Sequence, residues 1–272
     1  MTEALSPKKV RTTHLASFKQ AGQKFSCLTS YDSITAAIFD EAGIEVVLVG
    51  DSAADNALGY STTLPITVDE MIPFGRAVAS SVSRALVVVD MPFGSYEVSE
   101  AQALENAIKI MKLTGADAVK LEGGVRSANQ IAALTAAGIP VMGHIGFTPQ
   151  SVNTLGGFKV QGRGEDADAL LADAEAVAKA GAFAVVLELV PAALASEITS
   201  TFGIPTIGIG AGPETDGQIL VWTDFAGLSA HKPKKFVKQY AELRNSLLSA
   251  AKQYRAEVSS GEFPEPERSF EG

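Results

Sequence analysis

The sequence predicts an α/β protein, a (β/α)₈ TIM barrel with an N-terminal capping helix and a C-terminal helix plus tail. The first observation is a recurring unit, in which a short run rich in Val and Ile is followed by a turn and a helical pattern. The second is that the runs are continuously apolar, as expected of parallel strands covered on both faces by helices. About eight such units favour a barrel, because an open doubly wound sheet usually has fewer strands and often a nucleotide fingerprint.

The elements follow one another without a composition break. Residues 10–22 form an amphipathic pattern that predicts the leading helix, with Leu15 and Phe18 on one face. Strands are expected at residues 24–29, 46–50, 85–89, 118–121, 140–143, 184–187 and 206–209, with a weaker eighth at 219–222. Crossover helices are expected at residues 33–42, 68–83, 99–114, 127–137, 165–180 and 192–202, and a final helix at 234–258. We therefore expect a single domain over residues 1–272, with residues 1–9 and 259–272 as flexible or partner-docking tails.

Composition narrows the class of partner. The chain has 272 residues, 46% of them hydrophobic, which is ample for a large core. With 22 basic and 31 acidic side chains its formal charge is −9, which argues against nucleic acid or an anionic membrane and favours a small-molecule substrate. The single cysteine, Cys27, and a first segment without an apolar core predict a cytoplasmic protein. No stretch reaches the ~18 consecutive apolar residues that a membrane span needs.

Ionisable residues stand at the ends of five predicted strands, namely Asp51, Asp90, Glu122, His144 and Glu188. An acid after a strand often caps the next helix or a turn. That explanation fails for the set, because Asp51 and Asp90 are separated from the next helix and Glu188 is flanked by apolar residues. In a barrel the carboxyl ends of the strands carry the chemistry, so we expect these side chains to form the site.

Three of the acids predict a metal site. Asp51, Asp90 and Glu122 come from neighbouring strands and would repel one another unless a cation lies between them. A hard cation with oxygen ligands such as Mg²⁺ fits, and since Mg²⁺ often uses one or two carboxylates directly, some of the three could act through water. Zinc is less favoured, because His14 and His231 lie outside the strand ends.

Lys120, Glu188 and His144 have more than one possible role. Lys120 shares a strand face with Glu122, and could be a Schiff-base nucleophile or a cationic clamp on a carboxylate or enolate oxygen. The nearby acids keep a lysine protonated and favour the clamp. Glu188, isolated in an apolar strand, is the candidate general base for proton abstraction next to a carbonyl. His144 could contact the ligand or be a core histidine bonded to the backbone.

The long connection at residues 147–164 lacks periodicity and contains several glycines. Long irregular loops in compact domains are usually functional, so we interpret this loop as a lid. Lys159 and Arg163 could meet an anionic substrate there, although a structural loop is the simpler alternative.

Several motifs together resemble the ketopantoate hydroxymethyltransferase family. The likeness runs from about residue 10 to the tail and rests on the following stretches: Thr-Ser-Tyr-Asp at 29–32, Val-Gly-Asp-Ser at 49–52, Thr-Leu-Pro at 63–65, Asp-Met-Pro-Phe at 90–93, Val-Lys-Leu-Glu-Gly-Gly at 119–124, Gly-His-Ile-Gly-Phe-Thr-Pro-Gln at 143–150, Gly-Gly-Phe-Lys-Val-Gln-Gly-Arg at 156–163 and Ile-Gly-Ile-Gly-Ala-Gly at 207–212. The resemblance implies a barrel related to the phosphoenolpyruvate mutase and isocitrate lyase group, bound Mg²⁺ and a homo-oligomer, usually a decamer. It also implies 3-methyl-2-oxobutanoate and 5,10-methylenetetrahydrofolate as substrates, ketopantoate as product, and a place at the first step of pantothenate synthesis.

By position, the resemblance also implies roles for single residues. Asp51 and Asp90 match the metal carboxylates, which lie beside the substrate, and Glu122 matches the third acid of the metal site. Ser52 and Lys120 match substrate contacts, and Glu188 matches the general base. The chain departs from many members at residues 53–55, Ala-Ala-Asp in place of Leu-Gly-Met, and at Ser61, where an acid is common. These departures affect the expected shape of that loop and leave the site positions intact.

Other functions remain open from the sequence. One is a carbon–carbon lyase or mutase of the same barrel group, acting on another 2-oxo acid without folate. A Schiff-base aldolase through Lys120 is a further possibility. From a different class, the chain could be a non-catalytic barrel that binds a keto acid. Ionisable residues at the ends of five strands argue against this alternative.

Overall fold

The structure is a computed structural model that describes residues 5–230 and 232–270, so His231 and the extreme ends of both predicted tails lie outside the described residues. The chain divides into two compact units, one ending at Val221 and the other beginning at Trp222. Each unit is described by itself below. The expectation of a single domain over the whole chain stays a prediction.

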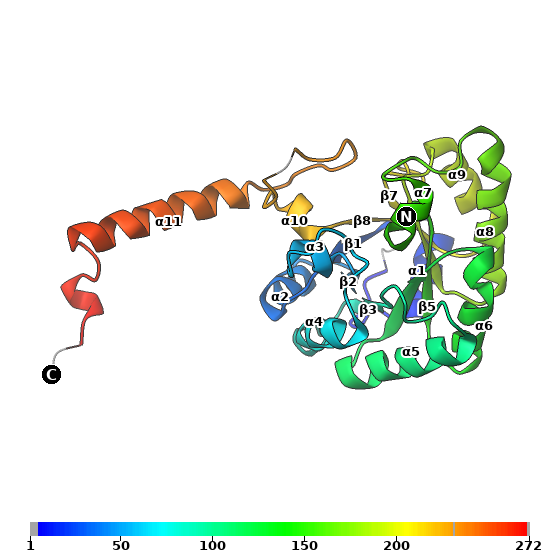
Figure 1. The fold of residues 1–272 in the computed structure, drawn as a ribbon, viewed down its shortest axis with the longest axis horizontal. Coiled ribbons are helices and arrows are strands. Elements are labelled where there is room, and N and C mark those ends of the chain that lie inside the picture. Colours follow the sequence, from blue (N-terminus) through cyan, green and yellow to red (C-terminus); the bar gives the residue numbers. More distant parts are fainter. Residues whose placement is uncertain (1–4, 231, 271–272) are drawn as a thin grey trace. The chain divides into compact units, whose positions relative to one another are not determined.

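The first unit is a closed barrel, as the sequence predicts (Figure 1). Among the described residues, eight parallel strands follow one another around the barrel in chain order, and β1 closes it by pairing with β8. The strands are β1 (Phe25–Thr29), β2 (Val46–Val49), β3 (Leu86–Asp90), β4 (Ala118–Glu122), β5 (Val141–Gly146), β6 (Ala184–Glu188), β7 (Thr206–Ile209) and β8 (Gly217–Leu220).

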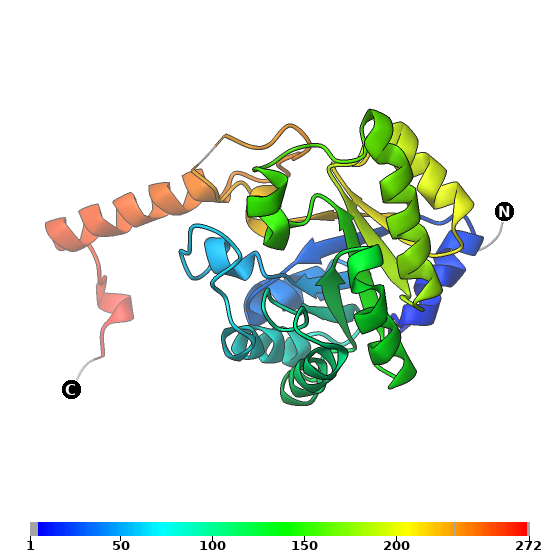
Figure 2. The same cartoon turned by 45° about the vertical axis from the view of Figure 1, so that its right-hand side comes forward.

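The helices of this unit lie outside the strands (Figure 2). The leading helix and all six predicted crossover helices are present, with ends that differ from the prediction by a few residues. They are α1 (Thr12–Gln20), α2 (Ser33–Glu41), α4 (Val68–Ser81), α5 (Glu100–Thr114), α6 (Ala128–Ala136), α8 (Ala167–Lys179) and α9 (Ala192–Thr201). Shorter turns that the sequence pattern does not reveal are α3 (Ala53–Asn56), α7 (Val152–Leu155), η1 (Val125–Ser127), η2 (Pro149–Ser151) and η3 (Gly164–Asp166).

Local sequence explains where the long helices begin and end. The Thr67 hydroxyl accepts the Glu70 N–H and the Glu70 carboxylate accepts the Thr67 N–H, a capping box that starts α4. The Ser99 hydroxyl caps α5, which ends at Gly115 in a left-handed conformation with φ 79°. The starts of α4 and α5 are thus fixed by their own side chains.

Burial explains why the strands are continuously apolar. All residues of β2, β3, β4, β6 and β7 are buried, because one face of each strand points into the barrel and the other packs under helices. The leading helix buries Leu15 and Phe18, and the Phe18 ring lies 6.0 Å from that of Phe25 on β1. Apolar contact therefore surrounds the strands and leaves their carboxyl ends for polar groups.

Register brings those polar ends into line. Asp90 pairs across β3 and β4 with Lys120, and Glu122 pairs across β4 and β5 with His144. Glu188 ends β6 opposite Gly146 of β5. Charged residues on successive strands are thus neighbours in space, as cross-strand pairs are.

The second unit contains α10 (Trp222–Phe225), α11 (Leu243–Ser260) and η4 (Pro266–Arg268). The predicted helix over residues 234–258 is wrong at its start, because residues 234–242 are irregular, with a turn at 235–236, and the helix begins at Leu243. There the Tyr240 N–H donates to the Phe225 carbonyl over 2.8 Å, and the two rings stack with centroids 5.0 Å apart. This contact fixes Tyr240 against α10, in the irregular segment before α11. Over the described residues, no helix has the length and apolar character to cross a membrane.

Candidate active site

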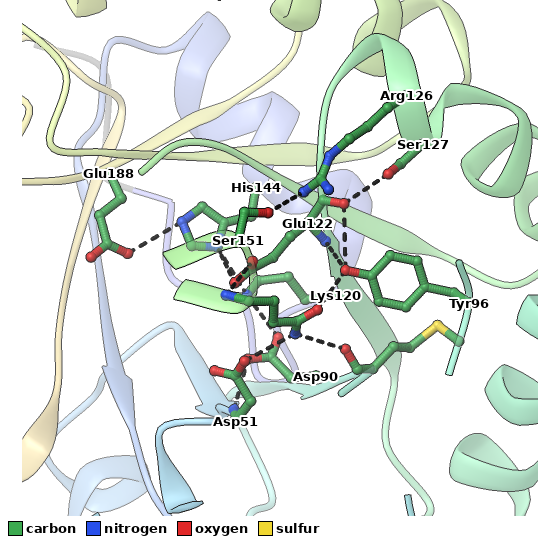
Figure 3. Close-up of polar contacts among 12 residues, drawn as sticks. Asp51, Asp90, Tyr96, Lys120, Glu122, Arg126, Ser127, His144, Ser151 and Glu188 are labelled. Carbon is green, nitrogen blue, oxygen red and sulfur yellow. Dashed lines mark hydrogen bonds and ion pairs between the residues drawn. The ribbon is translucent and has the colours of Figure 1, made fainter. Parts of the chain in front are cut away.

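Six buried ionisable side chains meet at the carboxyl ends of β2 to β6 (Figure 3). They are Asp51, Asp90, Lys120, Glu122, His144 and Glu188. All six were singled out from the sequence, and the structure brings them into one polar cluster inside an apolar barrel. Burying so many charges is unfavourable unless they pair or bind a ligand, so each contact in the cluster is informative.

Lys120 is paired with Asp90 and not with Glu122. Its Nζ lies 2.8 Å from Asp90 Oδ1, while Asp90 Oδ2 accepts the backbone N–H of Asp51 over 2.9 Å. Burial alone would lower the pKa of Lys120, but the carboxylates of Asp90, Glu122 and Asp51 hold it above its usual value. A permanently charged Lys120 suits a clamp on an anion better than a Schiff-base nucleophile.

The aspartates resist ionisation. Burial raises the pKa of Asp51 to about 8, and the negative charges of Asp90 and Glu122 act in the same direction. Burial also raises the pKa of Asp90, against the opposing effect of Lys120. A nearby cation would lower the pKa of both aspartates, because it favours the charged form of each carboxyl.

His144 links two acids. Its Nδ1 lies 3.4 Å from Glu122 Oε1 and 3.3 Å from Lys120 Nζ, and its Nε2 lies 3.2 Å from Glu188 Oε2. Burial and Lys120 both lower the pKa of His144, but the neighbouring carboxylates of Glu122 and Glu188 outweigh them and raise it to about 9. The ring nitrogens therefore lie against side chains of the cluster, and a ligand-contacting role for His144 stays a prediction.

The same contact corrects the view of Glu188. The sequence suggested a carboxylate isolated in an apolar strand, but the structure places it against His144, which lies on the neighbouring strand β5. Its position is fixed closely: the Phe147 N–H donates to the Glu188 carbonyl over 2.8 Å, and a Cβ on Gly146 would lie 2.3 Å from that carbonyl oxygen. Gly146, with φ 87°, thus lets β5 approach the end of β6.

The next residue, Leu189, is in the left-handed region with φ 50°. Its N–H donates to the Ile209 carbonyl and its carbonyl accepts the Gln161 N–H, both over 2.9 Å. A left-handed conformation is unusual for a leucine, and such strain concentrates at functional sites. The predicted lid is thus bonded to the residue beside Glu188.

Ser52, a predicted substrate contact, lies directly after Asp51 and precedes α3. Its hydroxyl is 2.7 Å from the Tyr31 hydroxyl, which also accepts the Thr29 hydroxyl over 3.1 Å. Burial raises the pKa of Tyr31 well above its usual value, so the phenol stays protonated. The altered residues 53–55 form the short helix α3, and Ala53 and Ala54 are buried.

Two residues of the cluster were missed from the sequence, Gln150 and Tyr96. Gln150 donates from Nε2 to Asp51 Oδ2 over 2.9 Å and from its backbone N–H to Glu122 Oε2 over 3.0 Å. The Tyr96 hydroxyl donates to Gln150 Oε1 over 2.6 Å. The only sequence signal was the Thr-Pro-Gln stretch at 148–150, which the lid interpretation had treated as part of a loop.

The predicted lid is not wholly irregular, since it contains η2 and α7. The Phe147 and Phe158 rings pack with centroids 4.4 Å apart, and the Arg126 guanidinium donates to the Ser151 hydroxyl over 2.8 Å, as Figure 3 shows. Its role as a lid stays a prediction.

The cluster fits a hard cation with few protein ligands. Over residues 5–230 and 232–270, no three His, Cys, Asp or Glu side chains are gathered into one coordination group, and Gln150 bonds to both Asp51 and Glu122. Buried oxygens of Asp90 and Glu122, Oδ1 and Oε1, have an ionic neighbour but no hydrogen bond. An all-oxygen set of this kind, completed by water, suits Mg²⁺ and does not suit zinc. The three-carboxylate site stays a prediction.

Solved structures with a similar fold share little sequence with this chain. A phosphonopyruvate hydrolase in complex with oxalate and Mg²⁺ is 12% identical with a TM-score of 0.61, covering 97% of this chain and 92% of that one. A phosphoenolpyruvate phosphomutase from Streptomyces platensis subsp. rosaceus is 14% identical with a TM-score of 0.61, covering 92% and 88%. Identities this low show the barrel fold alone.

Relatives in sequence are much closer. A protein from Leifsonia xyli subsp. xyli (strain CTCB07), named 3-methyl-2-oxobutanoate hydroxymethyltransferase, is 60% identical over 265 residues, or 97% of this chain and 96% of the relative. A protein of the same name from Mycobacterium bovis (strain BCG / Pasteur 1173P2) is 61% identical over 262 residues, or 96% and 93%. The family model described as Ketopantoate hydroxymethyltransferase matches residues 9–266. With nearly its whole length matched, the chain belongs to the ketopantoate hydroxymethyltransferase family.

Proposed function

We propose that this protein transfers a hydroxymethyl group from 5,10-methylenetetrahydrofolate to 3-methyl-2-oxobutanoate, giving ketopantoate and tetrahydrofolate in the first step of pantothenate synthesis. The observation that carries the proposal is the near full-length identity of about 60% to relatives named for this reaction. The buried cluster supports it, because it combines the charged Lys120, the carboxyl groups of Asp51 and Asp90, and the Glu188 carboxylate at the end of β6.

The substrate is an anion with a ketone beside its carboxylate, and the site offers matching groups. Lys120 is the buried cation that would attract its negative charge, and its pairing with Asp90 aims the ammonium at the cluster. Ser52, oriented by Tyr31, is a hydroxyl donor for the substrate, and His144 lies between Lys120 and Glu188. These residues would bind and orient the keto acid.

Asp51 and Asp90 are the residues that would hold Mg²⁺, with Glu122 as a third acid, directly or through water. When bound, the ion supplies Lewis-acid polarisation of the ketone and stabilises negative charge that develops on its oxygen. The phosphonopyruvate hydrolase of similar fold, solved with Mg²⁺ and oxalate, supports this choice of metal by analogy of fold.

Glu188 is the proposed general base. It removes the proton from carbon 3 of the keto acid, and the electron pair of that C–H bond forms the enolate. His144, bonded to Glu188 Oε2, holds the carboxylate in position. Carbon 3 then forms a bond to the one-carbon unit of the folate, as the bonds from that carbon to N5 and N10 break. The two nitrogens take up the proton removed from carbon 3 and one proton of a water molecule, so that tetrahydrofolate leaves and the remaining hydroxide becomes the oxygen of the new hydroxymethyl group.

Product analysis with and without the folate tests the proposal. With 3-methyl-2-oxobutanoate, methylenetetrahydrofolate and Mg²⁺ we expect ketopantoate, and without folate no carbon–carbon bond formation or cleavage. Cleavage of a 2-oxo acid without folate would instead identify a lyase or mutase. Trapping of the keto acid on Lys120 by borohydride would identify a Schiff-base enzyme, and binding without any turnover a non-catalytic barrel.

The affinity for Mg²⁺ is expected to rise with pH and then level off. The pKa of Asp51 is raised from 3.8 to about 8, so below that pH the cation must displace a proton. We therefore expect up to about a tenfold gain per pH unit between roughly pH 6 and pH 8. A carboxyl with the usual pKa of about 3.9 would give constant affinity over this range. Calorimetric titration in buffers of different ionisation enthalpy measures the proton release, and a flat profile would contradict the assignment.

Self-association and a cytoplasmic location are further parts of the proposal. Large apolar side chains are exposed on the first unit, among them Val98 at 80% and Ile34 at 73%, which favours self-association, and the family resemblance implies a decamer. The buried, unpaired Cys27 is in keeping with a reducing compartment. Sedimentation velocity on the full chain would measure the assembly, and a monomer at micromolar concentration would contradict it.

A further inference from the structure

Gln150 connects the polar ends of three strands, although it lies on a loop. It is buried within η2, and its amide bonds to Asp51 after β2 and to the Met91 carbonyl after β3, over 2.9 and 3.1 Å. Its backbone N–H bonds to Glu122 Oε2 on β4 over 3.0 Å. Every polar atom of its side chain is therefore engaged at the cluster where Mg²⁺ is proposed to bind.

The orientation of this amide is unambiguous. The Met91 carbonyl next to Nε2 can only accept a hydrogen bond, so the NH₂ group must face it, and the same group reaches Asp51 Oδ2. Oε1 then faces the Tyr96 hydroxyl at 2.6 Å, and that hydroxyl also accepts the Glu122 N–H over 3.2 Å. Burial and the charges of Glu122 and Glu97 raise the pKa of Tyr96, so the phenol remains a donor.

Glu122 is consequently fixed at both ends. Its carboxylate accepts from Gln150, its backbone N–H donates to Tyr96, and its carbonyl accepts the Ser127 hydroxyl over 2.8 Å. Figure 3 shows the hydroxyls of Tyr96 and Ser127 both beside the backbone of Glu122. Because Gln150 bonds to Asp51 and both Gln150 and Tyr96 bond to Glu122, the pair fixes the distance between these two acids.

We propose that Gln150 is a positioning residue for the metal site, which holds the Asp51 and Glu122 carboxylates ready for the cation and is itself oriented by Tyr96. The inference rests on the proposed function. A neutral amide is suited to the task, because it donates to Asp51 without cancelling the charge that attracts a metal, as a lysine would. The bond uses only Oδ2 of Asp51, so the other oxygen is left for ligation. Partners that orient metal ligands in this way typically change affinity by about 10- to 100-fold.

Because Gln150 lies on the loop at residues 147–164, the same bonds tie the loop to the metal site. A loop that moved as a lid would carry this donor with it. The loop and the Asp51 carboxylate are therefore expected to be coupled through one side chain.

The test is direct Mg²⁺ binding, measured calorimetrically on the full chain without substrates. Gln150→Leu keeps the approximate volume and removes the side-chain NH₂ group and oxygen, while the backbone N–H to Glu122 remains, and it is expected to weaken Mg²⁺ binding about 10- to 100-fold. Tyr96→Phe removes the hydroxyl that orients the amide and that also accepts the Glu122 N–H, and it is expected to weaken binding less than Gln150→Leu does. In the double variant the two losses are expected to add incompletely, since part of the effect of Tyr96 passes through Gln150 and part through its direct bond to Glu122. Gln20→Leu, the same substitution at an exposed position of α1, is the control and should bind as the wild type does.

Wild-type affinity in a folded Gln150→Leu variant would overturn the inference, and so would losses in the double variant that simply add. If Gln150→Leu does not fold, Tyr96→Phe still decides, because unchanged affinity in that variant contradicts the proposed linkage. Failure of the proposed function would be seen separately, as absence of Mg²⁺ binding in the wild type itself, and would overturn the inference with it.

Discussion

A Glu188→Gln variant is expected to lose solvent deuterium exchange into carbon 3 of 3-methyl-2-oxobutanoate by about 10²- to 10⁴-fold, with the fold retained. The amide has the shape of the carboxylate but cannot accept the proton. It can still accept a bond from His144, which now lies 3.2 Å from Glu188 Oε2, so the neighbourhood should stay intact. Exchange is followed by ¹H NMR in D₂O with Mg²⁺ and without folate, which isolates proton removal from carbon–carbon bond formation.

The matched control is Glu197→Gln on α9, the exposed glutamate of the helix that follows β6. It makes the same chemical change away from the cluster and should exchange at the wild-type rate. Exchange at that rate in Glu188→Gln would remove Glu188 from the role of base. Loss of overall turnover with normal exchange would place its role after proton removal.

Lys120→Met should destabilise the metal-free protein by about 3–5 kcal/mol, the usual loss when one partner of a buried ion pair is removed. The substitution keeps the aliphatic stem but leaves Asp90 without its cation, beside Asp51 and Glu122. Binding of the keto acid should be lost as well, because the same ammonium is the proposed anion clamp. Urea unfolding measures the first effect, and calorimetric titration with 3-methyl-2-oxobutanoate measures the second.

Lys109→Met provides the comparison. Lys109 pairs with Asp69 over 2.5 Å, but on the surface, with 43% and 77% of the two side chains exposed. A surface pair of this kind contributes about 0–1 kcal/mol, so its loss should hardly move the urea midpoint. If Lys120→Met and Lys109→Met had the same urea midpoint, the buried Lys120–Asp90 pair would contribute no more to stability than a surface pair does, which would contradict the prediction.

The barrel could be predicted because burial on both faces leaves a direct trace in the sequence. A run such as Val46–Val49 carries no polar residue on either face, and polar residues return only where the strand meets the site. Strand ends were less predictable: β5 extends to Gly146, beyond the predicted end at Gly143. Gly143, His144 and Gly146 have little intrinsic strand preference, and pairing with β4 and β6 holds them in the ladder.

Contacts within the site depend on register and loop geometry, which local patterns do not contain. The sequence places Glu188 among apolar neighbours along its own strand, whereas its polar partner, His144, comes from the strand beside it. Tyr96 and Gln150 are 54 residues apart, and both lie on connections between strands and helices. Their pairing follows only once the barrel closes. The start of α11 was likewise decided by a contact, that of Tyr240 with Phe225.

The left-handed backbone of Leu189 bears on which residues this position can accept, because Leu189 follows Glu188 directly. Glycine at this position would relieve a conformational penalty of about 1 kcal/mol, and by stability alone it would be the better residue. It would also widen the range of backbone angles next to Glu188, and with it the directions in which the carboxylate can point. The leucine therefore lowers the folding stability slightly and narrows the range of orientations open to Glu188, the proposed general base. Selection on turnover and selection on thermal stability should favour different residues at this one position.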